Sequence, residues 1–326
     1  MMDTTSELNT SFSHTDFLLM GFPGIAVSRP VLVIPFLFIY IGILMGNSLL
    51  MYRIWVEPSL QYPMYWLISL LFAVNLSCTT SIMPKFLLGL AFGLNQISLS
   101  GCLIQMYLIY SAIVFESALV LIMALDRFVA ICRPLHYHAI MTKCLLMWLN
   151  VINVARVLLL VSPIVISFMK VPFCRSNTIL SFACENMGLL SLGCGDVSKL
   201  QVIGLIVRIL VSVVDGGILF ISYIKILYTA MKLVSGKAHN KALSTCGTHL
   251  MVAALIYSCG LLSSIVYRLG TSVSINVQNT ISAIYYLFPA AVNPIIYGLR
   301  VSEIRICLEK AYGRRIKNND GVGHGN

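Results

Sequence analysis

The chain has 326 residues, of which 58% are apolar and only 10% are charged, and its mean hydropathy is +0.89. Soluble domains carry roughly 25% charged residues, so the composition excludes an ordinary soluble protein and favours a chain surrounded by lipid. The net charge of +10 does not indicate a nucleic-acid partner, because the Lys and Arg residues fall between apolar runs and not on a charge-rich domain.

The N-terminal segment is polar, carries Asp3 and Glu7, and lacks a basic n-region. No cleavable signal peptide is therefore predicted, and the first apolar helix is expected to act as a signal-anchor. A glycosylation sequon begins at Asn9. A second sequon, at Asn75, lies in an apolar run that the glycosylation machinery cannot reach if the run is in lipid.

Seven apolar runs are long enough for helices that cross the hydrocarbon core, which takes about 20 residues. They cover residues 31–52, 64–90, 102–125, 144–169, 200–228, 242–267 and 275–297. The prediction is an all-α membrane protein, with an N-terminal segment (1–30), a seven-transmembrane helix bundle (31–298) and a C-terminal segment (299–326). In the last segment, Val301, Ile304, Leu308 and Tyr312 recur at helical spacing, which predicts a short amphipathic helix on the membrane surface.

The basic residues are distributed unevenly about these spans. Fourteen fall on the side of the C-terminus, five on the side of the N-terminus and three within spans, which accounts for all 22. The positive-inside rule then predicts an extracellular N-terminus and a cytoplasmic C-terminus. The sequon at Asn9 agrees with this orientation.

Four of the ten cysteines lie on the predicted outer side, at Cys102, Cys174, Cys184 and Cys194. Only that side is oxidising, so these four can pair. They allow three pairings, and the sequence itself does not choose among them. The loop that carries three of them is expected to form a stapled lid.

Several motifs are spread over nearly the whole chain. They are GN at 46–47, PMYW at 63–66, MALDRFVAICRPLHY at 123–137, SY at 222–223, KALSTCGTHL at 241–250 and NPIIYGLR at 293–300. In this combination the chain resembles the rhodopsin-like G-protein-coupled receptors. Within them, GFPG at 21–24, EPSLQYPMY at 57–65 and PFCRSN at 172–177 resemble the class I, fish-like branch of the olfactory receptors.

The resemblance implies a plasma-membrane receptor for small odorants, with carboxylic acids expected for this branch. A stimulatory G protein that raises cAMP is the implied partner, and no cofactor is implied. It also implies the disulfides Cys102–Cys184 and Cys174–Cys194. Asp126 and Arg127 are expected to form a latch at the membrane boundary, from which the Arg is released to meet the G protein.

An activation switch is expected at Asn75, Glu116, Asn293, Pro294 and Tyr297. An ionisable group in mid-membrane, such as Glu116, is costly and usually functional. In the family this Glu pairs with an Asp on the second helix around a sodium ion. Asn75 stands at that position here, so one of the two negative charges that hold the ion in the family is missing.

The resemblance places ligand contacts at Tyr110, Tyr257, Ser264 and Arg268. A planar guanidinium such as that of Arg268 matches both oxygens of a carboxylate, and Ser264 lies one turn earlier on the same helix face. Tyr257 matches a switch tyrosine of the sixth helix, but Ser258 stands where a proline usually follows. The usual hinge of that helix is therefore in doubt.

The family pattern also places Gly204 and Arg208 on the pocket side of the fifth helix. Arg208 is ~13 Å below the outer end of that helix, too deep to reach water easily. Two interpretations stay open. Arg208 either makes an internal contact, with Asp215 at i+7 or with the backbone, or it is a second anion anchor beside Arg268.

Other classes of function are less well supported. A secondary transporter would show internal repeats and paired broken helices, which are not seen. An enzyme would need a phosphate loop, a nucleophile elbow or a metal set, and the histidines do not cluster as metal ligands. Arg156 in the fourth helix is interpreted as structural. A chemosensory receptor outside the nose stays an alternative, because sequence does not report tissue.

Overall fold

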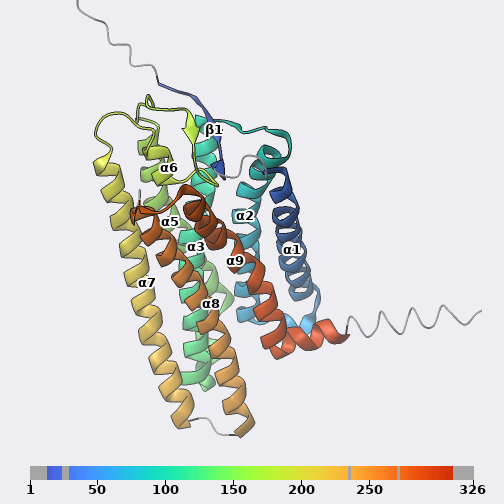
Figure 1. Cartoon of the computed structure of the whole chain (residues 1–326). Helices are drawn as coiled ribbons and strands as arrows, with labels where there is room; N and C mark the ends of the chain where they lie inside the picture. Colours follow the sequence, from blue (N-terminus) through green and yellow to red (C-terminus); the bar gives the residue numbers. More distant parts are fainter. Residues whose placement is uncertain (1–12, 24–28, 234–235, 270–271, 311–326) are drawn as a thin grey trace, which may run out of the picture.

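The computed structural model describes residues 13–23, 29–233, 236–269 and 272–310. Seven long helices run side by side as a bundle (Figure 1). They are α1 (Arg29–Val56), α2 (Pro63–Phe92), α3 (Leu99–Cys132), α5 (Lys143–Phe168), α7 (Ser198–Leu233), α8 (Gly236–Leu269) and α9 (Ile275–Arg300). All seven are long and apolar enough to cross a membrane, which confirms the predicted fold class.

Local sequence explains where several helices begin and end. Pro63 occupies the first turn of α2, where its missing N–H costs nothing. The same helix ends at Gly93, whose φ of 69° is the left-handed conformation that favours glycine. The side chains of Ser98 and Thr142 cap α3 and α5 by accepting hydrogen bonds from backbone N–H groups at 3.1 and 3.2 Å.

Helix α3 is the central element, because it packs against α2, α5, α7 and α8. Met106, Ile109, Leu119 and Met123 along its length are all buried. Three polar residues of α3 are buried as well, so they face other helices and not lipid: Gln105, Ser117 and Asp126.

A helix over residues 302–310 follows α9 and lies across the end of the bundle (Figure 1). Val301 and Ile304 are buried in the core that includes Leu50 and Leu60. Cys307 is buried as well, with its Sγ 3.8 Å from an oxygen of Glu57. Tyr312, the last position of the predicted apolar pattern, lies outside the described residues, as does the sequon at position 9.

A small three-stranded sheet at the opposite end was not predicted. Strand β1 (Asp16–Leu19) pairs antiparallel with β2 (Gln96–Ser98) and parallel with β3 (Thr178–Ile179). Phe17 in β1 is fully buried beneath it. Figure 1 shows β1 and the short helix α6 (Asn186–Leu190) at this same end, which we call the disulfide end.

Two disulfides join the segments at this end. Cys102–Cys184 ties the loop after α5 to the first turn of α3, with 5.4 Å between the Cα atoms. Cys174–Cys194 closes the loop on itself, with a Cα separation of 5.7 Å. Both are the pairs that the resemblance implies.

Peptide mapping without reductant should therefore recover these two cross-linked pairs. Reduction before digestion should release all four peptides, which serves as the control. Recovery of Cys102 with Cys174 or Cys194 would contradict the loop described here.

Candidate functional site

A cavity of about 170 Å³ lies among α3, α5, α6, α7, α8 and α9, towards the disulfide end. Five of the six predicted ligand contacts line it. They are Tyr110, Gly204, Arg208, Tyr257 and Ser264. The sixth, Arg268, belongs to α8, but its side chain lies outside the described part of the structure.

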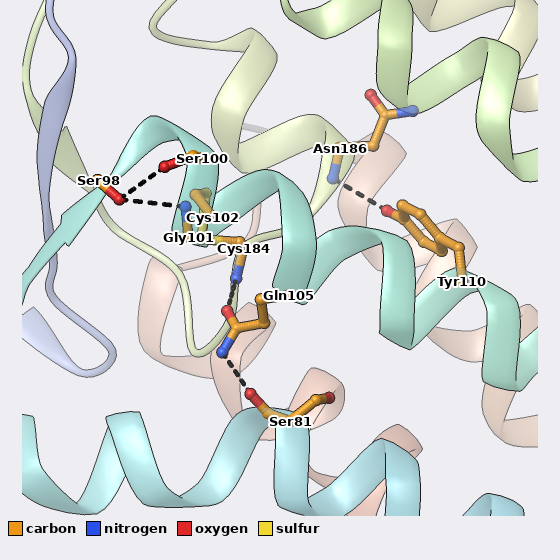
Figure 2. The surroundings of a disulfide bond; sticks show 9 residues. All are labelled: Ser81, Ser98, Ser100, Gly101, Cys102, Gln105, Tyr110, Cys184 and Asn186. Carbon is orange, nitrogen blue, oxygen red and sulfur yellow. Dashed lines mark hydrogen bonds between the residues drawn. A yellow bond between two sulfur atoms is a disulfide. The ribbon is translucent and has the colours of Figure 1, made fainter.

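The loop after α5 roofs this cavity. Gln105 of α3 accepts a hydrogen bond from the backbone N–H of Cys184 at 2.9 Å and donates to the carbonyl of Ser81 at 2.8 Å (Figure 2). Farther along the loop, the N–H of Asn186 donates to the Tyr110 hydroxyl at 2.9 Å. The disulfide and these bonds hold the loop against α3.

Three consecutive lid residues that sequence reasoning missed, Glu185, Asn186 and Met187, also line the cavity. They come directly after Cys184, whose bond to Cys102 fixes them over α3. That position was the available signal, because the residues next to the bridge must hang over the centre of the bundle.

Among the described residues that line the cavity, Arg208 is the cation. Its Nη2 donates to the carbonyl oxygen of Gly260 in α8 at 2.7 Å, and its guanidinium lies 5.6 Å from the ring centroid of Tyr285 in α9. Of the two internal contacts considered from the sequence, the described structure has the backbone one. Arg208 thus links three helices at the cavity wall.

Asp215, the alternative partner, is engaged elsewhere. It accepts hydrogen bonds from Arg156 of α5 at 2.7 Å and from Ser117 of α3 at 2.5 Å. The Ser117 and Tyr257 hydroxyls lie 2.9 Å apart. Since Ser117 and Tyr257 both line the cavity, this four-helix polar network forms its floor. The structural interpretation of Arg156 agrees with this contact.

The predicted switch positions lie deeper in the bundle. Asn75 donates to Asn47 at 3.1 Å, and Asn47 donates to the Ala290 carbonyl at 3.0 Å, which joins α2, α1 and α9. Asn75 and Glu116 line a separate small cavity of about 30 Å³. Asn293, three residues after Ala290 on α9, is fully buried. Among the described residues no group of three or more His, Cys, Asp and Glu forms a metal site.

Pro294 and Tyr297 continue the switch positions along α9. Pro294 packs against Gly46 of α1, where an added Cβ would lie 3.4 Å from the proline ring. The Tyr297 hydroxyl lies 3.4 Å from Nδ1 of His249 in α8. His249 lies in the KALSTCGTHL motif, and no role was predicted for it. Its contact with Tyr297 joins α8 to α9.

Asp126 lies at the end of the bundle away from the disulfides and is fully buried. It accepts hydrogen bonds from Arg127 at 2.5 and 3.0 Å and from Tyr137 of α4 (Tyr137–Ile140) at 2.7 Å. Burial and the adjacent Asp126 carboxylate raise the pKa of the Tyr137 hydroxyl, so it keeps its proton and remains a donor. The latch thus has a second donor that sequence reasoning did not assign.

A seven-helix membrane bundle with a roofed cavity at one end and an Asp-Arg pair at the other defines a rhodopsin-like G-protein-coupled receptor. A family model described as olfactory receptor matches residues 36–315. Human olfactory receptor 52K1 is 34% identical over 296 residues, which cover 91% of this chain and 94% of that receptor. The chain belongs to the olfactory receptor family, and its relatives are those of the class I branch.

Further relatives match over similar lengths. Human olfactory receptor 52K2 is 34% identical over 311 residues, or 95% of this chain and 99% of that receptor. Mouse olfactory receptor 56B34 is 33% identical over 307 residues, or 94% and 95%. Membership makes the chain a multi-pass plasma-membrane receptor and not an enzyme, with odorant ligands and a G-protein partner.

Proposed function

We propose that the chain binds a small organic acid in the 170 Å³ cavity and activates a stimulatory G protein, which raises cAMP. The observation that carries this proposal is the partly buried cation Arg208 in the cavity wall. A charge removed from water is stabilised by a partner of opposite charge. The guanidinium has five N–H donors, and the bond to Gly260 occupies one of them.

The same proposal orients the receptor with the disulfide end outside the cell. The excess of Lys and Arg on the other side supports this orientation. The Asp126 end then faces the cytoplasm, where Leu135 is 95% exposed beside the latch. The G protein is then expected to meet this end of the receptor.

The test is a cAMP panel of carboxylic acids, amines and neutral odorants, in cells that express the receptor and a stimulatory G protein. Acids should activate wild type. Arg208→Leu and Arg268→Ala should each weaken the response to acids at unchanged surface expression. Activation by neutral odorants alone would refute the acid ligand, and a ligand response without cAMP would refute the stimulatory G protein.

Gly204→Ala should raise the concentration of agonist needed for a half-maximal response by about fivefold. An added Cβ would lie 2.6 Å from the Asn186 amide nitrogen, so the Asn186 side chain must move. Overpacking costs about 1–3 kcal/mol, and the low end of this range applies because the end of a flexible side chain can move. About 1 kcal/mol corresponds to about fivefold in affinity. The measurement is a cAMP dose–response curve.

Gly217→Ala is the matched control, because it lies on the same helix and an added Cβ would meet nothing within 4 Å. Equal dose–response curves for Gly204→Ala and wild type would show that the place of the Asn186 side chain beside Gly204 does not matter for the ligand.

A further inference from the structure

The lid places hydrogen-bond acceptors in the wall of the proposed ligand cavity. Glu185 is 6% exposed and lines the cavity, and its carboxylate has two acceptor oxygens. Asn186 lines it as well, and its Oδ1 is buried without a hydrogen-bond partner in the described structure. A buried acceptor without a partner costs about 1–3 kcal/mol, so a ligand donor at this place gains affinity.

The position of Asn186 is fixed before any ligand arrives. Its backbone N–H donates to Tyr110 at 2.9 Å (Figure 2). Its side-chain nitrogen lies where only a glycine at position 204 leaves room. Because the backbone of the residue is held, less ordering is needed when a ligand donor binds.

The cavity also carries charges of both signs. Arg208 and Glu185 both line it, and they interact electrostatically. A plain carboxylate beside Arg208 would add a second negative charge near Glu185. A ligand that also carries a donor, above all a cationic one, offsets that repulsion.

We propose that the cavity recognises a small carboxylic acid with a hydrogen-bond donor at its other end, the carboxylate on Arg208 and the donor on Glu185 and Asn186. This inference rests on the proposed function and narrows its ligand class. An ammonium donor should bind more tightly than a hydroxyl, because Glu185 is acidic.

The probes are γ-aminobutyrate, γ-hydroxybutyrate, butyrate and butylamine, with shorter and longer homologues of each. Binding is measured as ligand-induced thermal stabilisation of purified full-length receptor, beside cAMP in cells. The amino acid of best length should bind about 10- to 100-fold more tightly than the plain acid of the same length, as expected for a hydrogen bond to a charged group. The hydroxy acid should fall between them.

Glu185→Gln is nearly isosteric and should remove most of the advantage of the amino acid while leaving plain-acid affinity equal or higher. Arg208→Gln should weaken every acid and spare the amine. Asp196→Asn is the control: it removes an exposed carboxylate from the same loop, outside the cavity, and an amide can still accept the bond from Ser198. It should leave the order of affinities unchanged.

The outcomes separate this inference from the proposed function. Plain acids that bind as tightly as amino acids, or an amino-acid preference that survives Glu185→Gln, would overturn the inference while acid-driven cAMP upheld the function. Amino acids that stabilise the purified receptor but raise no cAMP would support the inference and refute the coupling.

Discussion

Asp215→Ala should lower the free energy of unfolding by about 3 kcal/mol, the largest stability change expected of any single substitution considered. The substitution leaves the guanidinium of Arg156 in the bundle without its carboxylate, and it removes the acceptor of the Ser117 hydroxyl. Loss of one partner of a buried ion pair costs about 3–5 kcal/mol. The low end of this energy range applies because the Arg156 side chain is 24% exposed, so water can partly solvate the unpaired charge.

Thermal unfolding of the purified receptor provides the measurement. Glu309→Ala breaks a pair at 3.8 Å whose side chains are 53% and 68% exposed, and should cost less than about 1 kcal/mol. Arg156→Met combined with Asp215→Leu removes both charges and should recover much of the loss. An Asp215→Ala receptor that melts like wild type would mean that the network is not formed.

Arg127→Ala should reduce the maximal cAMP response by about tenfold or more, while ligand binding at the distant cavity stays intact. In the described conformation Arg127 is bound to Asp126, and Tyr137 holds the same carboxylate. This closed pair would be one state of the latch. In the other state, Arg127 would be released towards the G protein. Coupling free energies of 1–3 kcal/mol, or about 5- to 150-fold, are typical of such links.

The experiment compares cAMP and ligand-induced thermal stabilisation in the same variant, at matched surface expression. Arg305→Ala removes an exposed cation at the same end of the bundle and should leave both readouts near wild type. Undiminished cAMP output from Arg127→Ala would disprove its role in coupling.

The helices were predictable because each span is a long run of apolar residues with few charges, which is a local property. Their ends were less so: α7 and α8 continue past the predicted spans, since a helix does not stop where the hydrocarbon core does. Strand β1 had no local signature. Its four residues pair with segments around residues 97 and 178, and such long-range backbone pairing leaves no pattern in DFLL itself.

Side-chain partners were the hardest part to predict. Helical spacing puts Arg208 and Asp215 on similar faces of α7, so their pairing was a reasonable alternative. The sequence did not reveal that Arg156, on another helix, donates a hydrogen bond to Asp215 at 2.7 Å. The Asp215 carboxylate therefore already has a cationic partner. Glu185 was overlooked because it lies in a loop, where no periodicity indicates which way a side chain points.

The roof of the cavity is held in place without the side chains of residues 185–187. Backbone hydrogen bonds join β1, β2 and β3, and disulfides anchor the loop at Cys184 and Cys194. Glu185, Asn186 and Met187 hang beneath this frame into the cavity and take no part in its strands or bridges. A change of odour preference can therefore evolve at three consecutive codons without rebuilding the architecture that presents them.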